Sequence, residues 1–246
     1  MGKKQKTDKD TVVVYWSAKT SPERQTYVHL LWGPPVPLTK LMPEGSGPGR
    51  SGNYRSCIAL ISMLKNTYAL VHPLTHSVTV SGDLESPDVT ADLDIWLKRD
   101  NPLKNRYSLD YDFGWLFFAE ESLKIKVTPP YFHNTSAGKS GFLASGSFDI
   151  GKWFRMVNMA YIFWEGHNTM TVTEGEPAMY VEFLTDKKVI LKQFECTEEL
   201  MSMSIQVVDA SNVAMKRKTL EYRYDKFFKA NRHKRVLKLI KENLLE

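Results

Sequence analysis

Residues 169–194 read TMTVTEGEPAMYVEFLTDKKVILKQF, and this stretch decides the fold class. Three strand-like runs, Thr169–Val172, Met179–Phe183 and Val189–Phe194, are separated by the turn segments Glu174–Pro177 and Thr185–Lys188. Glycine, proline and aspartate between short apolar runs are typical of turns that join strands. The spacing predicts a predominantly β body of the sandwich or roll type.

Similar runs recur toward the N-terminus. They predict strands at Thr11–Trp16, Tyr27–Trp32, Tyr68–Val80 (two strands broken at His72-Pro73), Trp115–Phe118, Leu123–Val127 and Phe148–Trp164 (two runs). Arg55–Asn66 is expected to be a short helix. The expected loops are Gly33–Gly52, rich in proline and glycine, then Asp83–Asp112, with a short element near Ile95–Leu97, and Thr135–Ser147.

After Cys196, the spacing of apolar residues changes from that of a strand to that of a helix. Thr197 is expected to cap a helix that has Glu198 and Glu199 in its first turn. Further helices are predicted over Leu220–Lys229 and Arg232–Leu245. The predicted fold class is therefore α+β and predominantly β, with a polar N-terminus at 1–10 that we expect to be disordered, a β-rich body at 11–195 and a basic helical extension at 196–246.

Composition places the chain among globular proteins. Its 246 residues are 42% hydrophobic and 25% charged, and no apolar run approaches the roughly 18 residues that span a bilayer. Two cysteines, Cys57 and Cys196, are too few for a disulfide framework. Because the first residues lack the apolar stretch of a signal peptide, we expect the chain to stay in the reducing compartment where it is made.

The positive charge is concentrated at the C-terminal end. Residues 214–246 hold 11 Lys and Arg against four Asp and Glu, whereas residues 11–213 are mildly acidic. Aromatic residues lie among these charges, a combination that suits nucleic acid. The candidates for polyanion binding are Lys216, Arg217, Lys218, Arg232, Lys234 and Arg235. The plainer alternative is a set of amphipathic helices that leave these charges in solvent. The residues expected to dock them are Leu220, Tyr224, Phe227, Val236, Leu239 and Ile240.

Few residues suggest catalysis or metal binding. His72 and His76 would lie roughly 13 Å apart in an extended strand, too far for one metal ion, so no metal site is predicted. Glu174 and Glu176 are interpreted as turn residues rather than an acid–base pair, and Cys57 as a small buried side chain rather than a nucleophile. Gly138-Lys139-Ser140 lacks the upstream glycine of a phosphate-binding loop. No cofactor is predicted.

Several segments carry a resemblance to a known group of proteins. They are Cys57–Pro73 with Lys65–Tyr68, the Pro129–Phe132 step, Phe148–Arg155 (FDIGKWFR), Glu174–Phe183 (EGEPAMYVEF) and Thr185–Lys188. In these segments the chain resembles uncharacterised proteins encoded by large tailed phages of marine bacteria, over most of residues 50–245. The resemblance implies a viral gene product, in the host cytoplasm or the virion, and brings no assigned activity.

A weaker likeness, of fold alone, is to the β-clip of dUTPase-type nucleotide hydrolases. Asp149 and Gly175-Glu176 precede the Met179–Phe183 run as an Asp segment and a hairpin do in that group. The nucleotide-binding Arg-Gly-Ser-Ser-Gly and the glycine-rich C-terminal arm of that group are missing from this chain, and fold alone does not establish function.

The sequence is consistent with two functions. The favoured one is a non-enzymatic viral protein that acts through binding or assembly, with a protein partner or self-association and no membrane. The alternative is an enzyme or binder that acts on a nucleotide or another phosphorylated small molecule. Its candidate residues are Arg50, Arg55, Asp149, Arg155 and Glu182.

Overall fold

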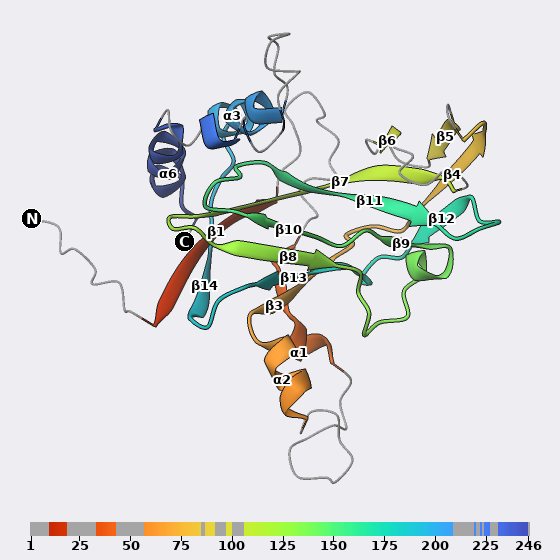
Figure 1. The fold of residues 1–246 in the computed structure, drawn as a ribbon, viewed down its shortest axis with the longest axis horizontal. Coiled ribbons are helices and arrows are strands. Elements are labelled where there is room, and N and C mark those ends of the chain that lie inside the picture. Colours follow the sequence, from red (N-terminus) through yellow and green to blue (C-terminus); the bar gives the residue numbers. More distant parts are fainter. Residues whose placement is uncertain are drawn as a thin grey trace, which may run out of the picture.

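Three β-sheets make up most of the structure, a computed structural model that describes residues 10–18, 33–42, 57–84, 87–91, 97–99, 106–208, 219, 222, 224–226 and 231–245. The predominantly β character expected from the sequence is confirmed. Figure 1 shows the sheets stacked near the centre, with helices on two opposite sides.

The largest sheet has the first strand of the chain in its interior. Its order is β14 (Lys188–Gln193), β1 (Thr11–Ala18), β7 (Ser108–Ala119), β11 (Met156–Phe163) and β9 (Gly141–Leu143), with β6 (Leu97–Arg99) also paired to β7. β1 runs parallel to β14 and antiparallel to β7. Val14 and Trp16 lie in one hydrophobic cluster and Tyr15 in another. The run TVVVYW is continuously apolar because both faces of β1 are covered.

A second sheet packs against one face of the first. Its order is β10 (Gly146–Asp149), β8 (Lys124–Thr128), β13 (Pro177–Phe183), β3 (Thr67–Val71) and β2 (Val36–Pro37). The main core lies between the two sheets, where the rings of Phe117 and Phe183 meet edge to face with centroids 5.8 Å apart. Ile125 and Val127 point into this core while Lys124 and Lys126 are exposed, which confirms the predicted alternation of this strand.

The third sheet lies at one end of the stack and contains β12 (Thr169–Val172), β4 (His76–Gly82) and β5 (Pro87–Ala91). Two loop expectations prove wrong here. Asp83–Asp112 contains β5 and the first part of β7, and Thr135–Ser147 contains β9. The strand β6 begins at Leu97, where a short element was expected. The sequence does not predict β5 and β9 as strands, because β5 begins with a proline and β9, with only three residues, is too short to show a clear alternation of apolar and polar residues. Pairing with neighbouring strands, rather than local alternation, defines them.

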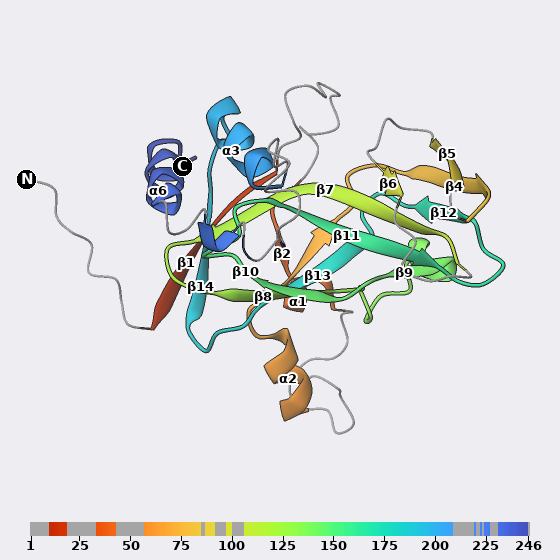
Figure 2. The same cartoon turned by 45° about the horizontal axis from the view of Figure 1, so that its top comes forward.

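Helices α3 (Glu198–Val208) and α6 (Arg232–Glu242) cover the outer face of the large sheet, as Figures 1 and 2 show. The second hydrophobic cluster joins Leu116 and Phe118 of β7 to Leu200, Val236 and Ile240 of these helices. The predicted cap is confirmed, because the amide of Leu200 donates to Thr197 Oγ1 at 3.4 Å. Parts of the predicted extension, including most of Leu220–Lys229, lie outside the described residues.

Two short helices lie on the opposite side of the molecule. α1 (Leu38–Leu41) and α2 (Ile58–Leu64) flank the outer face of the second sheet, where Leu38, Leu64 and Tyr180 form a third cluster. α2 confirms the helix predicted within Arg55–Asn66, and Asn66 follows it with a left-handed φ of 54°. The predicted strand Tyr27–Trp32 and most of the loop Gly33–Gly52 lie outside the described residues.

Candidate functional site

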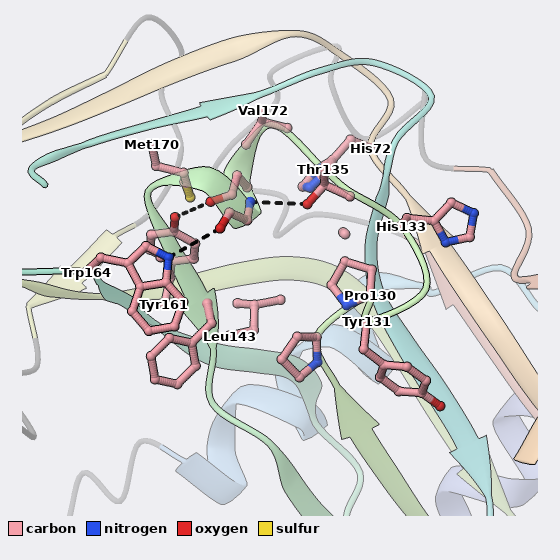
Figure 3. A pocket seen from close by; sticks show the side chains of 16 residues that line it. His72, Pro130, Tyr131, His133, Thr135, Leu143, Tyr161, Trp164, Met170 and Val172 are labelled. Carbon is pink, nitrogen blue, oxygen red and sulfur yellow. Dashed lines mark hydrogen bonds between the residues drawn. The ribbon is translucent and has the colours of Figure 1, made fainter.

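A pocket of about 200 Å³ opens where the three sheets meet (Figure 3). Its walls come from the end of β3, the segment between β8 and β9, and strands β9, β11, β12 and β13. The described lining residues are His72, Pro129, Pro130, Tyr131, His133, Thr135, Ala137, Gly138, Gly141, Phe142, Leu143, Tyr161, Trp164, Met170, Val172 and Ala178. Carbon-rich side chains dominate this set, and no Lys, Arg, Asp, Glu or Cys belongs to it.

One wall is aromatic and depends on a glycine. The ring of Phe142 packs against Trp164 with centroids 4.8 Å apart and an interplanar angle of 33°. Gly141 brings β9 this close to β11, since a Cβ at that position would lie 2.3 Å from the carbonyl oxygen of Ile162 and 2.6 Å from Tyr161 Cζ. Trp164 is 40% exposed and so presents part of its ring to solvent.

The opposite wall is the segment 129–140, which several hydrogen bonds fix in place. Tyr161 donates its hydroxyl hydrogen to the carbonyl oxygen of Ala137 at 2.5 Å, and Trp164 Nε1 donates to the carbonyl oxygen of Gly138 at 3.3 Å. These carbonyls belong to a single 3₁₀ turn, η4 (Ala137–Lys139). The amide groups of Lys139 and Ser140 bond to carbonyl oxygens within the turn, which agrees with the interpretation that Gly138–Ser140 is no phosphate loop.

Glu176 lies outside the pocket and forms hydrogen bonds with Ser136, which directly precedes η4. Its carboxylate accepts from the backbone nitrogen of Ser136 at 2.7 Å and from Ser136 Oγ at 3.1 Å. Thr173 Oγ1 adds a hydrogen bond of 2.8 Å to that serine oxygen. The turn predicted around Glu174 and Glu176 is confirmed, with Gly175 at a φ of 82°. Sequence reasoning missed that Glu176 also holds the pocket wall.

His72 is the buried histidine of the pocket. It is 6% exposed, and burial, with a smaller contribution from His76, lowers its pKa to about 3. Its ring is therefore neutral at physiological pH. The His72 and His76 rings lie 6.2 Å apart, which corrects the roughly 13 Å expected for an extended chain. The chain turns between the end of β3 and the start of β4, so the two rings meet edge to face.

His133 also lines the pocket, and both of its ring nitrogens are engaged in the fold. The hydroxyl of Tyr180 contacts His133 Nδ1, and His133 Nε2 lies 3.2 Å from the carbonyl oxygen of Leu41. Because a carbonyl only accepts, His133 carries its hydrogen on Nε2 and accepts the Tyr180 hydrogen at Nδ1. Burial raises the pKa of Tyr180, and burial also raises that of Tyr161 to about 12, so both phenols stay protonated.

The residues proposed from sequence for phosphate chemistry lie elsewhere. Asp149 ends β10, and its carboxylate accepts from Ser122 Oγ at 2.5 Å, from the Leu123 amide at 3.0 Å and from the Gly151 amide at 2.9 Å. Arg155 donates to Asn158 Oδ1 and to the Met156 carbonyl oxygen.

Glu182 lies on β13, and β8 separates that strand from β10, which carries Asp149. Glu182 is in register with Lys126 of β8. None of these three residues lines the pocket. Arg50 and Arg55 lie outside the described residues.

The polyanion candidates are described only in part. Arg232, Lys234 and Arg235 of α6 are exposed, and Arg235 forms an ion pair with Glu199. Lys216, Arg217 and Lys218 lie outside the described residues. Cys57 precedes α2 and is exposed, which corrects the expectation that it is buried.

Two kinds of feature are absent from the part of the chain that the structure describes, a metal site and a membrane-spanning helix. No three His, Cys, Asp or Glu residues there are grouped as a metal would require. No described helix combines the length and the apolar character needed to cross a membrane.

No protein-family model matches the chain, and neither a curated protein nor a solved structure matches it significantly. The resemblance to phage proteins and the likeness to the dUTPase-type β-clip therefore stay predictions. The assignment of function rests on the geometry and chemistry of the pocket.

Proposed function

We propose that the protein is a non-enzymatic binding protein whose pocket holds a small, uncharged and largely apolar ligand. The observation that carries this proposal is the composition of the wall, in which the aromatic pair Phe142 and Trp164 faces prolines and aliphatic side chains. Such walls gain free energy by removing apolar ligand surface from water. A neutral His72 adds no charge that would attract an anion.

The size of the pocket narrows the ligand further. A cavity of about 150 Å³ lined by apolar residues is enough to hold benzene in another protein. A pocket of about 200 Å³ therefore suits a molecule with one substituted ring. A nucleotide is larger and carries phosphate charge, and the lining residues offer no cationic side chain to balance that charge.

A thermal-shift screen separates the two functions carried forward from the sequence. One panel contains uncharged single-ring compounds, and the other contains nucleotides and phosphate monoesters. A ligand at 100 times its dissociation constant should stabilise the protein by about 2.7 kcal/mol. We expect stabilisation by members of the first panel only. Stabilisation confined to the second panel would instead support the phosphorylated-ligand alternative and its candidates Arg50, Arg55, Asp149, Arg155 and Glu182.

Trp164→Ala provides the matched binding variant, because Trp164 is partly exposed and its removal disturbs the core little. It should weaken ligand binding, since it deletes the exposed part of the aromatic wall. Tyr222→Ala is the control, because Tyr222 is also exposed and does not line the pocket. Equal loss of affinity in both variants would contradict the proposed site.

A second candidate function concerns the basic helical extension. Val236 and Ile240 of α6 are buried against the large sheet, whereas Arg232 and Lys234 of the same helix are exposed. Several neighbouring cations are already neutralised: Arg235 pairs with Glu199, Lys238 with Glu242 and Lys241 with Glu120. This arrangement supports weak, sequence-independent and salt-sensitive binding of nucleic acid.

Charge reversal tests this second function. Replacing Lys216, Arg217, Lys218, Arg232, Lys234 and Arg235 with Glu should abolish binding to duplex DNA at about 50 mM salt and change the melting temperature little. Absence of binding by the wild-type protein at that salt concentration would leave α6 as a solvated helix that packs on the sheet.

We also propose the viral setting that the phage resemblance implies, in the host cytoplasm or the virion, with assembly through a protein partner or self-association. Mass spectrometry of purified virions, together with the size of the purified protein in solution, tests it. A strictly monomeric protein that is absent from virions and recovers no partner from infected cells would overturn this part of the proposal.

A further inference from the structure

Thr135 carries a hydroxyl group whose hydrogen-bonding capacity is only half used. The residue lines the pocket and is 4% exposed. Its Oγ1 accepts from the amide of Gly138 at 3.2 Å, the bond drawn in Figure 3. A threonine hydroxyl also has one hydrogen to donate. Within the described part of the chain, no acceptor receives that hydrogen.

Three other polar side chains of the pocket, those of Tyr161, Trp164 and His133, form hydrogen bonds with the fold. The Tyr161 hydroxyl donates to the Ala137 carbonyl oxygen, and Trp164 Nε1 donates to the Gly138 carbonyl oxygen. His133 is engaged on both ring nitrogens. Thr135 therefore differs from these neighbours, because it retains a neutral donor beside an apolar wall.

We propose that the ligand carries a neutral oxygen acceptor on its ring, of the aryl ketone or aldehyde class, and that Thr135 donates a hydrogen bond to it. This inference rests on the proposed function of the pocket. Leaving a buried donor unpaired costs free energy, whereas a ligand oxygen at that point satisfies it. An apolar wall with a few placed polar groups is the usual design of a selective small-molecule site.

Acetophenone and isopropylbenzene test the inference, because they are single-ring compounds of similar size and only acetophenone has a carbonyl oxygen. Their dissociation constants are measured by ligand-observed NMR titration with the wild-type protein. A single neutral hydrogen bond predicts that acetophenone binds about 3- to 10-fold more tightly. The carbonyl stretch of bound acetophenone should also move to lower wavenumber than in cyclohexane, since donation to the oxygen weakens that bond.

Two substitutions of Thr135 assign the preference to this residue. Thr135→Val keeps the shape and removes the hydroxyl, so it should abolish the preference for acetophenone and the infrared shift. Thr135→Ser keeps the hydroxyl and should preserve both effects. Because Thr135→Val also leaves the Gly138 amide without its acceptor, isopropylbenzene serves as the control that reports whether the pocket has stayed intact.

The outcomes separate the two proposals. If neither probe binds the wild-type protein, the proposed function fails. If both bind wild type equally and the carbonyl stretch does not move, the pocket stands and the inference about Thr135 is overturned. A preference that survives in Thr135→Val also overturns it. Should Thr135→Val fail to fold, the infrared shift in wild type and in Thr135→Ser decides, because its absence in either protein contradicts donation by the hydroxyl.

Discussion

The hydroxyl group of Tyr15 donates a hydrogen bond of 2.7 Å to Glu120 Oε1, which joins the first strand to the end of β7. Lys241 Nζ of α6 lies 2.8 Å from the same oxygen, so one carboxylate connects two strands and a C-terminal helix. Burial, and then the bond to Glu120, raise the pKa of Tyr15. Burial pushes the pKa of Glu120 upward, but the bonds from Lys241 and Tyr15 outweigh it and hold that pKa below its ordinary value.

This arrangement predicts a loss of stability in acid. A carboxylate whose pKa is lowered by folding stabilises the native state above its unfolded pKa of about 4.3, and that contribution disappears as the pH falls through the lower folded value. Glu120→Gln should cost about 1 kcal/mol at pH 7, a modest value because the carboxylate is partly exposed. The difference between wild type and variant should vanish at low pH in urea unfolding. Glu174→Gln, in an exposed turn, is the control and should change the free energy of unfolding at pH 7 little.

The burial of His72 predicts a second pH dependence. The pKa of His72 in the folded protein, about 3, lies below the value of about 6.5 in the unfolded chain. As the pH falls below about 6.5, the unfolded chain therefore binds a proton at this histidine and the folded chain does not. Stability should fall by about 1.4 kcal/mol for each pH unit below 6.5, and His72→Asn should remove this slope. The control is His167→Asn, because His167 is exposed. A slope that persists in His72→Asn would assign the effect to other groups.

Gly141 should not tolerate a side chain. Gly141→Ala places a Cβ 2.3 Å from the Ile162 carbonyl oxygen, and overpacking of this kind costs about 1–3 kcal/mol. Thermal unfolding and ligand titration should show lower stability together with weaker binding, because β9 must move away from β11. Gly33→Ala is the matched control, since nothing lies within 4 Å of its Cβ position. Normal stability of Gly141→Ala would mean that β9 lies farther from β11.

The bond between Glu176 and Ser136 predicts that two glutamates of one turn behave differently. Glu176→Ala removes two hydrogen bonds to the pocket wall and should cost about 1–2 kcal/mol of stability. It should also weaken ligand binding and speed ligand release, which relaxation NMR can measure. Glu174→Ala leaves Ser136 untouched and should match the wild type in both measurements. If the two variants showed the same stability and the same ligand affinity, Glu176 would have no role in holding the pocket wall.

The sequence predicted strands best where a strand shows its own pattern. Alternation in Leu123–Val127 and the turn glycine at position 175 correspond to β8 and to the β12–β13 turn. β9 and β5 were missed because their conformation is set by pairing with distant strands, Leu143 with Tyr161 for example. Tertiary pairing overrides weak local preference in such short segments.

The pocket was harder to predict than the fold because its walls are ordinary apolar residues. Trp164 and Met170 carry no motif, and only the fold places them together. Thr135 lies in a segment whose glycine and serine content indicated a loop. The residues that did stand out chemically, such as Asp149, form hydrogen bonds that organise turns.

The parallel pairing of β1 with β14 sets the order of events during synthesis. Thr11 is in register with Lys188, so β1 is synthesised long before its parallel partner β14. The helices that cover its other face are made later still. Contacts of such large sequence separation slow folding and lengthen the time for which apolar strands are exposed. The largest sheet can therefore be completed only after β14 has been synthesised, and until then the edge of β1 that pairs with β14 lacks its partner.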